Sequence, residues 1–232
     1  MLKIGFVATR GDSRIILVPE TVDKYSKLPA ELYFQKNSGA LSFLPDSAYS
    51  ANVKMVDRAD ILKTVDIVMS SGPLLQDDLD QIHDDSCIIN TMASYQHPEN
   101  LIPFTKRKVI TYSLDMVPRT SLAQSMDILS SMASIAGYKA VVIAANMLPR
   151  YFPMLMTASG TIKPAKVLIL GAGVAGLQAI STARRLGAVV EVFDTRAAVK
   201  EEVASLGAKF IEVEGAKDEK SAGGYAVQQT EE

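Results

Sequence analysis

Three glycines and one acidic residue carry the clearest chemical signal in this sequence. Gly171, Gly173 and Gly176 follow an apolar run at 165–170. Their G-x-G-x-x-G spacing lets a tight turn bring the backbone close to a pyrophosphate at the positive end of the next helix. Asp194 ends the next apolar run, roughly 20 residues on, where a carboxylate can accept a hydrogen bond from an adenosine ribose. This pattern predicts a dinucleotide site that prefers NAD to NADP, because an acid there repels a 2′-phosphate.

The elements around the glycines fit this interpretation. We expect a buried strand before them, a helix over 173–186 whose first residues include Val174 and Ala175, and a second strand that ends in the acid Asp194. The alternative is a structural glycine-rich turn in an unrelated α/β protein, since glycines often mark ordinary turns. The flanking pattern favours the dinucleotide site. The expected elements are strands over 166–170, 189–193 and 209–213 and helices over 173–186 and 197–206.

This succession is one mononucleotide-binding half of a doubly wound domain. A complete dinucleotide domain uses two such halves. We therefore expect an NAD-binding domain over 151–213 that is incomplete at its C-terminus, in a chain that is a fragment or a truncated product. The charged stretch 214–232 has no periodicity, and we expect a mobile tail there.

The first half of the chain alternates short apolar strands with helices, which argues for a parallel α/β sheet. We expect an N-terminal domain of this class over 1–118. Its predicted strands cover 2–8, 31–35, 65–70, 87–91 and 108–111, and its predicted helices cover 19–28, 57–63, 75–83 and 98–105.

A segment of different character lies between the two domains. Residues 122–146 contain no proline and a single glycine, and apolar residues recur there at helical spacing. We predict a single helix of about 25 residues that opens near Thr120 and Ser121, within an active-site loop and connecting helix at 119–150. We interpret its apolar stripe as core packing. That stripe comprises Met126, Leu129, Met132, Ala133, Ala136 and Ala140.

Composition narrows the function classes. The chain of 232 residues has a formal net charge of −2 and is 48% hydrophobic, which gives no reason to expect nucleic acid as a partner. One cysteine excludes an internal disulfide. No cluster of His, Cys and acids has metal-ligand spacing, so we predict no metal site. No run of about 18 apolar residues is free of charge, so we expect no membrane span.

Several segments resemble one known family. Residues 116–141, 154–166, 193–198 and 222–226 are similar to the NAD(H)-binding component of proton-translocating nicotinamide nucleotide transhydrogenase. The similarity covers the whole chain and is most specific from 116 to 224. That family is related to alanine dehydrogenase, with which it shares fold and domain order. The resemblance therefore implies two Rossmann-like α/β domains joined by a long helix.

The resemblance also implies an activity. The family transfers hydride from NADH to NADP⁺ on a separate component, and a membrane component couples the transfer to proton movement. NAD(H) would bind to this chain and NADP(H) to a partner. The resemblance further implies a homodimer in the cytoplasm, attached to the inner face of the membrane through its partners.

Individual roles follow by matching the family's motifs. Arg119, Gln124 and Asp127 match a loop that holds the nicotinamide end and orients its ring for transfer. Ser130 matches a serine that contacts the nicotinamide amide. The other matches concern the rest of the nucleotide. Asp194 matches the ribose-binding acid, with Thr195 and Arg196 beside it. Gly224 and Tyr225 match the mobile loop that closes over the nucleotide.

Two other functions stay open. Alanine dehydrogenases use a Lys and a His in the first domain, but this chain has the segments 70–73 (Ser-Ser-Gly-Pro) and 90–92 (Asn-Thr-Met) where we expect them. Arg14 matches an arginine of the wider family. An alanine dehydrogenase-like enzyme is therefore one alternative, and an inactive NAD-binding fragment is the other.

Overall fold

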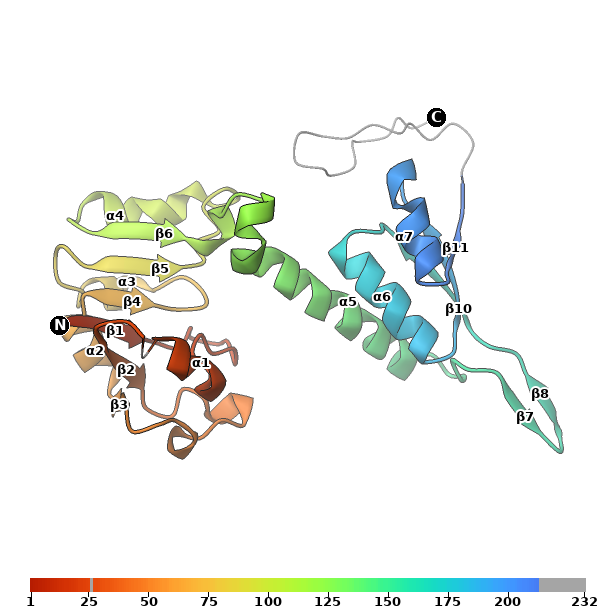
Figure 1. Ribbon diagram of the computed structural model, residues 1–232, viewed down its shortest axis with the longest axis horizontal. Coiled ribbons are helices and arrows are strands. Elements are labelled where there is room, and N and C mark those ends of the chain that lie inside the picture. Colours follow the sequence, from red (N-terminus) through yellow and green to blue (C-terminus); the bar gives the residue numbers. More distant parts are fainter. Residues whose placement is uncertain (26, 213–232) are drawn as a thin grey trace. The chain divides into compact units, whose positions relative to one another are not determined.

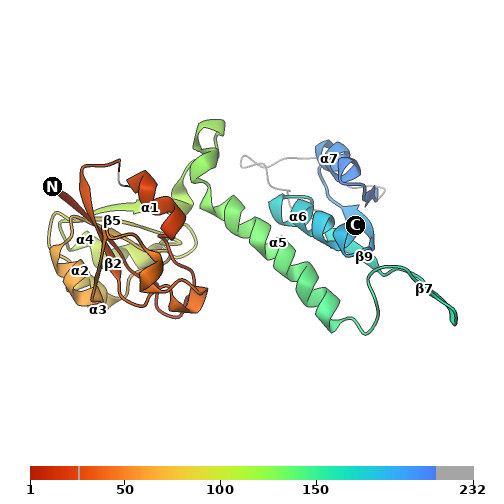
Figure 2. The same cartoon turned by 60° about the horizontal axis from the view of Figure 1, so that its bottom comes forward.

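The computed structural model describes residues 1–25 and 27–212. The chain divides into two compact units, Met1–Asp127 and Ile128–Glu232. We call them unit 1 and unit 2. Unit 1 has two hydrophobic clusters and unit 2 has one, and both units appear in Figures 1 and 2.

Unit 1 is built on a six-stranded parallel sheet with the order β3-β2-β1-β4-β5-β6. This order belongs to the doubly wound dinucleotide-binding folds, in which the chain reverses direction across the sheet between β1 and β4. The strands are β1 (Leu2–Phe6), β2 (Ala30–Gln35), β3 (Val53–Val56), β4 (Ile67–Met69), β5 (Cys87–Asn90) and β6 (Ile110–Ser113).

The helices of unit 1 are short. The α-helices are α1 (Pro19–Tyr25), α2 (Arg58–Thr64), α3 (Gln76–Leu79) and α4 (Ile102–Thr105). The 3₁₀ helices are η1 (Ala40–Ser42), η2 (Asp46–Ala48), η3 (Pro98–Leu101), η4 (Leu114–Met116) and η5 (Ser121–Met126).

Strand β1 shows how the sequence separates the two sides of this sheet. Ile4 and Phe6 are buried in one cluster with Leu32 and Phe34 of β2. Gly5 points to the other side, because successive strand residues face opposite ways. A Cβ on Gly5 would lie 2.3 Å from Cγ2 of Ile61. Gly5 therefore lets α2 lie close against β1.

Unit 2 contains a three-stranded parallel sheet, ordered β11-β10-β9, and an antiparallel hairpin, β7-β8. The strands are β7 (Leu155–Thr157), β8 (Gly160–Ile162), β9 (Lys166–Leu170), β10 (Val189–Phe193) and β11 (Lys209–Phe210). The helices are α5 (Ile128–Met147), α6 (Val174–Arg185), η6 (Ala197–Val199) and α7 (Lys200–Ser205).

Helices α5 and α6 of unit 2 pack along each other (Figure 1). Gly137 of α5 makes this possible, since a Cβ there would lie 2.0 Å from the backbone oxygen of Ala175. Gly137 and Val141 are the buried residues of α5. The apolar stripe that we predicted as core packing is wrong at four of its six positions, which are exposed: Met126, Leu129, Ala136 and Ala140. The buried face is the neighbouring one, which the small residue Gly137 brings against α6.

The single helix predicted from Thr120 onward is also wrong at its start. Residues Ser121–Met126 form the 3₁₀ helix η5, and α5 begins at Ile128. Asp127 between them has a ψ of 89°, which is not helical. Serine and aspartate compete with helical backbone bonding through their short polar side chains. That tendency separates the two elements at Asp127.

Most other predicted elements are present with shifted ends, and the predicted α/β class with Rossmann-like sheets is confirmed. Strand β3 and the hairpin β7-β8 were not predicted from the sequence. Both are short, and the hairpin strands contribute no buried residue. The predicted helix over 75–83 is limited to α3, and the predicted strand over 209–213 ends at Phe210 among the described residues.

Helix α5 has the length and mean hydropathy of a helix that crosses a membrane. Lys139 is its single charged residue. Length and composition alone are weak grounds for a membrane span, because core helices of soluble domains meet the same test. Helix α5 packs along α6, although only two of its residues, Gly137 and Val141, are buried.

Candidate functional site

The glycine turn joins β9 to α6 in unit 2. Gly171 adopts a φ of +94°, which favours glycine. A Cβ on Gly176 would lie 1.8 Å from the backbone oxygen of Gly171, so the third glycine is needed for α6 to pack on the turn. A Cβ on Gly171 or on Gly173 would meet no atom within 4 Å. The turn therefore leaves open space beside the first N–H groups of α6, as a bound pyrophosphate requires.

Val174 and Ala175 form the first turn of α6, whose N-cap is Gly173. Val174 is 43% exposed, and Ala175 is half-buried. No acidic side chain lies in this turn. The positive end of the helix dipole is therefore available to an anion rather than satisfied by a carboxylate of the same turn.

Asp194 follows β10 and is tied to the glycine turn. Its Oδ2 accepts a hydrogen bond from the backbone N–H of Ala172 at 2.7 Å. Its side chain is 4% exposed and forms an ion pair with Arg196. The hydrogen bonds from the Arg196 side chain, assisted by those from two backbone N–H groups, lower the pKa of Asp194 to about 2 although burial opposes this shift. Asp194 is thus an ionised carboxylate at the end of the strand, as predicted from sequence.

Thr195 and Arg196 continue from Asp194. The hydroxyl oxygen of Thr195 is buried and has no hydrogen-bond partner within the described part of the chain. Such a group is available to bond a polar ligand atom. Together with the open turn at Gly171 and Gly173, this orphaned hydroxyl fits a dinucleotide that lies across the ends of β9 and β10.

The residues matched to the nicotinamide-binding loop lie on unit 1. Arg119 and Gln124 are exposed, and Asp127 is half-buried. The structure brings Gln124 and Asp127 together through a 3.3 Å bond from the backbone N–H of Asp127 to the carbonyl oxygen of Gln124. Ser130 lies in the first turn of α5 and so belongs to unit 2.

The strand ends of unit 1 hold a polar network that the sequence analysis missed. Asp78 is 1% exposed, and Arg58 contacts both of its carboxylate oxygens at 2.8 Å. Arg10 adds a third contact at 3.2 Å. Burial raises the pKa of Asp78, but the hydrogen bonds and charge of Arg58, with smaller contributions from Leu75 and Arg10, hold that pKa below its ordinary value. These partners are far apart in sequence, so no local pattern indicates them.

Of the two segments where an alanine dehydrogenase would carry Lys and His, the one at 70–73 is held by hydrogen bonds within unit 1. The buried Ser70 donates to the carbonyl oxygen of Gly72 at 2.7 Å. Thr9 Oγ1 and Ser71 Oγ lie 2.9 Å apart, and Thr9 Oγ1 also accepts from the backbone N–H of Gly72. In the segment at 90–92, Asn90 is fully buried, and neither polar atom of its carboxamide has a hydrogen-bond partner within the described part of the chain. These segments present no basic side chain that could remove a proton from an amino acid.

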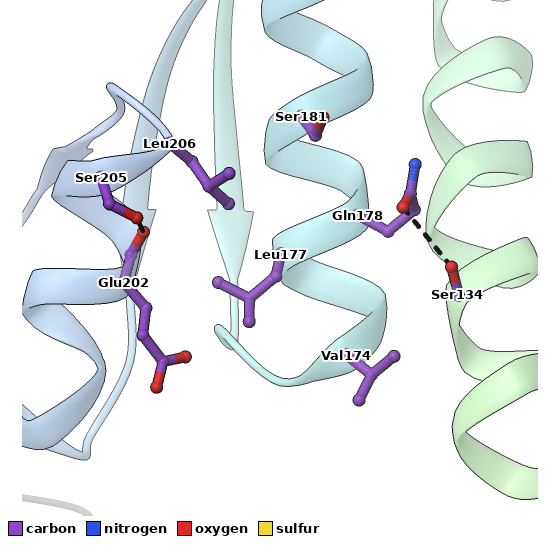
Figure 3. A pocket seen from close by; sticks show the side chains of 8 residues that line it. All are labelled: Ser134, Val174, Leu177, Gln178, Ser181, Glu202, Ser205 and Leu206. Atoms are coloured by element: carbon purple, nitrogen blue, oxygen red, sulfur yellow. Dashed lines mark hydrogen bonds between the residues drawn. The ribbon is translucent and has the colours of Figure 1, made fainter. Parts of the chain in front are cut away.

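A cavity of about 450 Å³ lies beside α6 in unit 2 (Figure 3). Gln178 reaches across it toward Ser134 of α5, with Ser134 Oγ and Gln178 Oε1 3.4 Å apart. The cavity runs along the side of α6. Its lining shares only Val174 with the region of the glycine turn, so we do not assign the cavity to the dinucleotide. The lining residues are Ser134, Val174, Leu177, Gln178, Ser181, Glu202, Ser205 and Leu206.

Two further expectations concern the tail and metal binding. Gly224 and Tyr225, predicted in a mobile loop, lie outside the described residues. Within the described part of the chain, no group of three His, Cys, Asp or Glu residues could hold a metal ion.

The glycine turn, Asp194 and the two α/β units all point to a family of nicotinamide-dependent enzymes. The family model for the N-terminal domain of alanine dehydrogenase/PNT matches residues 8–136. The model for the C-terminal domain of the same family matches residues 140–231. The chain belongs to the alanine dehydrogenase/PNT family. The resemblance drawn from the sequence is therefore confirmed.

Within this family the chain is more similar to transhydrogenases than to alanine dehydrogenases. It is 40% identical over 232 residues to an NAD(P) transhydrogenase alpha subunit polypeptide of Rhodospirillum rubrum, covering 96% of the chain and 60% of that protein. It is 37% identical to NAD(P) transhydrogenase subunit alpha of Haemophilus influenzae, covering 95% of the chain and 43% of that protein. An alanine dehydrogenase of Bilophila wadsworthia is 26% identical, with 78% of the chain and 49% of that protein covered.

Solved structures agree with the sequence comparison. The transhydrogenase of Sinorhizobium meliloti matches with a TM-score of 0.86 and 38% identity, over 90% of the chain and 64% of that structure. An L-alanine dehydrogenase matches with a TM-score of 0.77 and 21% identity, over 90% of the chain and 60% of that structure, and shows a shared fold. The chain spans 60% or less of the length of the transhydrogenase subunits that it matches.

Proposed function

We propose that this chain is the NAD(H)-binding component of a proton-translocating NAD(P) transhydrogenase. It would bind NADH and present it to NADP⁺ on a separate component, while a membrane component couples the transfer to proton movement. The observation that carries this proposal is the glycine turn with Asp194 at its edge, in a chain similar over most of its length to transhydrogenase alpha subunits.

The residues of unit 2 would hold the adenosine half of the dinucleotide. The backbone N–H groups at the start of α6, next to Gly173, would receive the pyrophosphate. Asp194 would accept hydrogen bonds from the ribose, with Thr195 and Arg196 beside it. When bound, the nicotinamide supplies the hydride, and the protein's part is binding and orientation.

The loop that contains Arg119, Gln124 and Asp127 would hold the nicotinamide end of the dinucleotide, as the family resemblance implies. Gln124 can both donate and accept hydrogen bonds, which suits a carboxamide. Arg119 and Asp127 would fix the loop or bind the amide and ribose, and Ser130 would contact the amide. Transfer between two nicotinamides needs no general base, so orientation and exclusion of water determine its rate. The absence of a basic side chain from the segments at 70–73 and 90–92 agrees with such a reaction.

The proposal includes partners and a location. The partners are the NADP-binding and membrane components and a second copy of this chain in a homodimer. Attachment to the cytoplasmic face of the membrane would come through these partners rather than through a span of this chain, in keeping with the packing of α5 along α6.

NADH binding to the purified protein is the first test. We expect a saturable increase in NADH fluorescence at low nucleotide concentration and a weaker response to NADPH, because the carboxylate of Asp194 disfavours a 2′-phosphate. Hydride exchange between NADH and an NADP⁺ analogue should then appear once an NADP-binding component is added. NADH formation from an amino acid and NAD⁺ alone would favour the alanine dehydrogenase alternative. Binding of neither nucleotide would leave an inactive fragment and refute the proposal for this chain.

A further inference from the structure

The carboxylate of Asp194 has every ordinary acceptor position filled. Its Oδ1 accepts from the backbone N–H of Arg196 at 2.8 Å and from Arg196 Nε at 3.0 Å. Its Oδ2 accepts from the backbone N–H of Ala172 at 2.7 Å and from Arg196 Nη2 at 2.8 Å. A carboxylate offers about four lone-pair positions. A ribose hydroxyl can therefore bind Asp194 only by replacing one of these donors.

The donor most easily replaced is the Arg196 side chain. The two backbone donors are fixed by the glycine turn and by the chain direction after β10. The guanidinium binds both carboxylate oxygens in parallel, which is the bidentate geometry that arginine favours. A ribose presents two neighbouring hydroxyl groups that can bind a carboxylate in the same paired way. The guanidinium thus occupies the approach that a ribose diol needs.

We infer that the Arg196 side chain competes with the ribose for Asp194, leaves it when the dinucleotide binds, and then lies where it attracts a 2′-phosphate. This inference rests on the proposed binding of NAD(H) at the glycine turn. Ala172 keeps its bond to Asp194 in both states, so the turn retains its shape. The unpartnered hydroxyl of Thr195 provides a further polar contact beside the ribose.

Selectivity between NADH and NADPH would depend on this competition. An isolated aspartate rejects a 2′-phosphate by charge repulsion. An aspartate with an arginine two residues later carries no net charge as a pair, and arginine near this position is the group that accommodates a 2′-phosphate in NADP-binding proteins. Arg196 would therefore lower the affinity for NADH, because it competes with the ribose for Asp194. It would raise the affinity for NADPH, because its positive charge attracts the 2′-phosphate.

Dissociation constants for NADH and NADPH in wild-type protein and in Arg196→Ala test this inference. We expect Arg196→Ala to bind NADH more tightly and NADPH more weakly, so that the ratio of the two constants changes by about tenfold in favour of NADH. Arg196→Lys keeps the charge without the paired donors. Its binding of NADPH should stay within about threefold of wild type.

Controls separate the inference from the proposed function. Arg185→Ala removes the same charge from an exposed position at the end of α6, and it should leave both constants unchanged. If wild-type protein does not bind NADH, the proposed function fails. If wild-type protein binds NADH and the ratio is unchanged in Arg196→Ala, or moves toward NADPH, the inference about Arg196 is wrong. Should circular dichroism show that Arg196→Ala does not fold, Arg196→Gln, which retains an amide donor, is judged by the same ratio.

Discussion

At the scale of single residues, the ionised carboxylate of Asp194 links the site to the stability of unit 2. It bonds the glycine turn through Ala172 and its own strand end through Arg196. Its pKa of about 2 lies below the ordinary value of 3.8. A group whose pKa is lowered by folding stabilises the folded state only while it is ionised.

This shift predicts a pH dependence. In the folded protein Asp194 stays ionised down to a pH of about 2, whereas in the unfolded chain it takes up a proton near 3.8. The unfolded state therefore binds more protons in this window, and stability falls as the pH falls through it. In Asp194→Asn this contribution is absent, so the free energy of unfolding, measured in urea, should fall less between pH 5 and pH 2 than in wild type. Parallel curves of unfolding free energy against pH for wild type and Asp194→Asn would contradict the prediction. The control is Glu201→Gln, which removes one carboxylate from the exposed face of α7 and should follow the wild-type curve.

Gln124 belongs to the same scale, and its predicted role is orientation. Removal of its carboxamide in Gln124→Ala should slow hydride transfer to an NADP-binding component by about 100-fold, because small misplacements of a reacting group cost that much in rate. The dissociation constant for NADH should change far less. Single-turnover rates and NADH titration measure the two effects separately. Equal effects on rate and binding, or no effect on rate, would remove Gln124 from the orienting loop.

At the scale of elements, the turn between strand β9 and helix α6 is a feature of the site that the sequence could predict. The spacing of Gly171, Gly173 and Gly176 and the acid at 194 predicted the turn, since these roles depend on residues close in sequence. The ion pair of Asp78 with Arg58 joins α3 to α2 across 20 positions. No local periodicity reports such a contact, and the sequence analysis missed it.

Contacts between distant residues also explain why the predicted start and buried face of α5 were wrong. Helical periodicity identified a long apolar segment, but it did not show which face would be buried. Packing against α6 decided that, through the close approach of Gly137 to Ala175. The start of the helix at Ile128 depends on a non-helical ψ at Asp127, which a pattern of apolar residues does not reveal.

Gly173 and Gly176 of the turn differ in what an added methyl group would contact. In Gly176→Ala the methyl would lie 1.8 Å from the oxygen of Gly171. We expect a loss of about 1–3 kcal/mol in the free energy of unfolding from overpacking. In Gly173→Ala the methyl meets nothing within 4 Å, so stability should change by less than about 1 kcal/mol.

The affinity for NADH gives a second comparison of Gly173→Ala and Gly176→Ala. Here Gly173→Ala, the variant with the smaller expected loss of stability, is the one in which the added methyl group would meet the ligand. The methyl of Gly173→Ala would project into the space proposed for the pyrophosphate, and binding should weaken by about tenfold or more in a variant that is fully folded. Titration with NADH and urea unfolding of both variants give the comparison. A stable Gly173→Ala protein that binds NADH as well as wild type would show that the dinucleotide does not approach this turn.

At the scale of the whole molecule, the chain consists of two units with separate cores. One cluster, in unit 2, surrounds Ile180 and Val192. Two clusters in unit 1 cover the two sides of its sheet and include Ile61 and Phe6 respectively. A protein built in this way need not unfold in a single transition, and its stability is then described by one free energy for each unit.

Two substitutions, one in each unit, test this independence. Arg58→Met removes the main partner of Asp78, which is 1% exposed, and leaves this buried carboxylate, among the described residues, with only the longer 3.2 Å ion pair to Arg10. Breaking such a pair costs about 3–5 kcal/mol, so unit 1 should lose a large part of its stability. Gly176→Ala should lower the stability of unit 2 alone. Scanning calorimetry should therefore show two transitions, with Arg58→Met lowering the midpoint of one and Gly176→Ala that of the other.

The double variant makes the test quantitative. Because the two positions share no cluster, their effects on stability should add to within about 0.5 kcal/mol. Arg58→Met should also leave the midpoint of the unit 2 transition, and the intrinsic affinity of the glycine turn for the adenosine half of NADH, as they are in wild type. A single transition that both variants shift in parallel would mean that the units unfold together. The nucleotide site of unit 2 would then depend on the core of unit 1, and variants of the Asp78 network would have to be counted among those that weaken NADH binding.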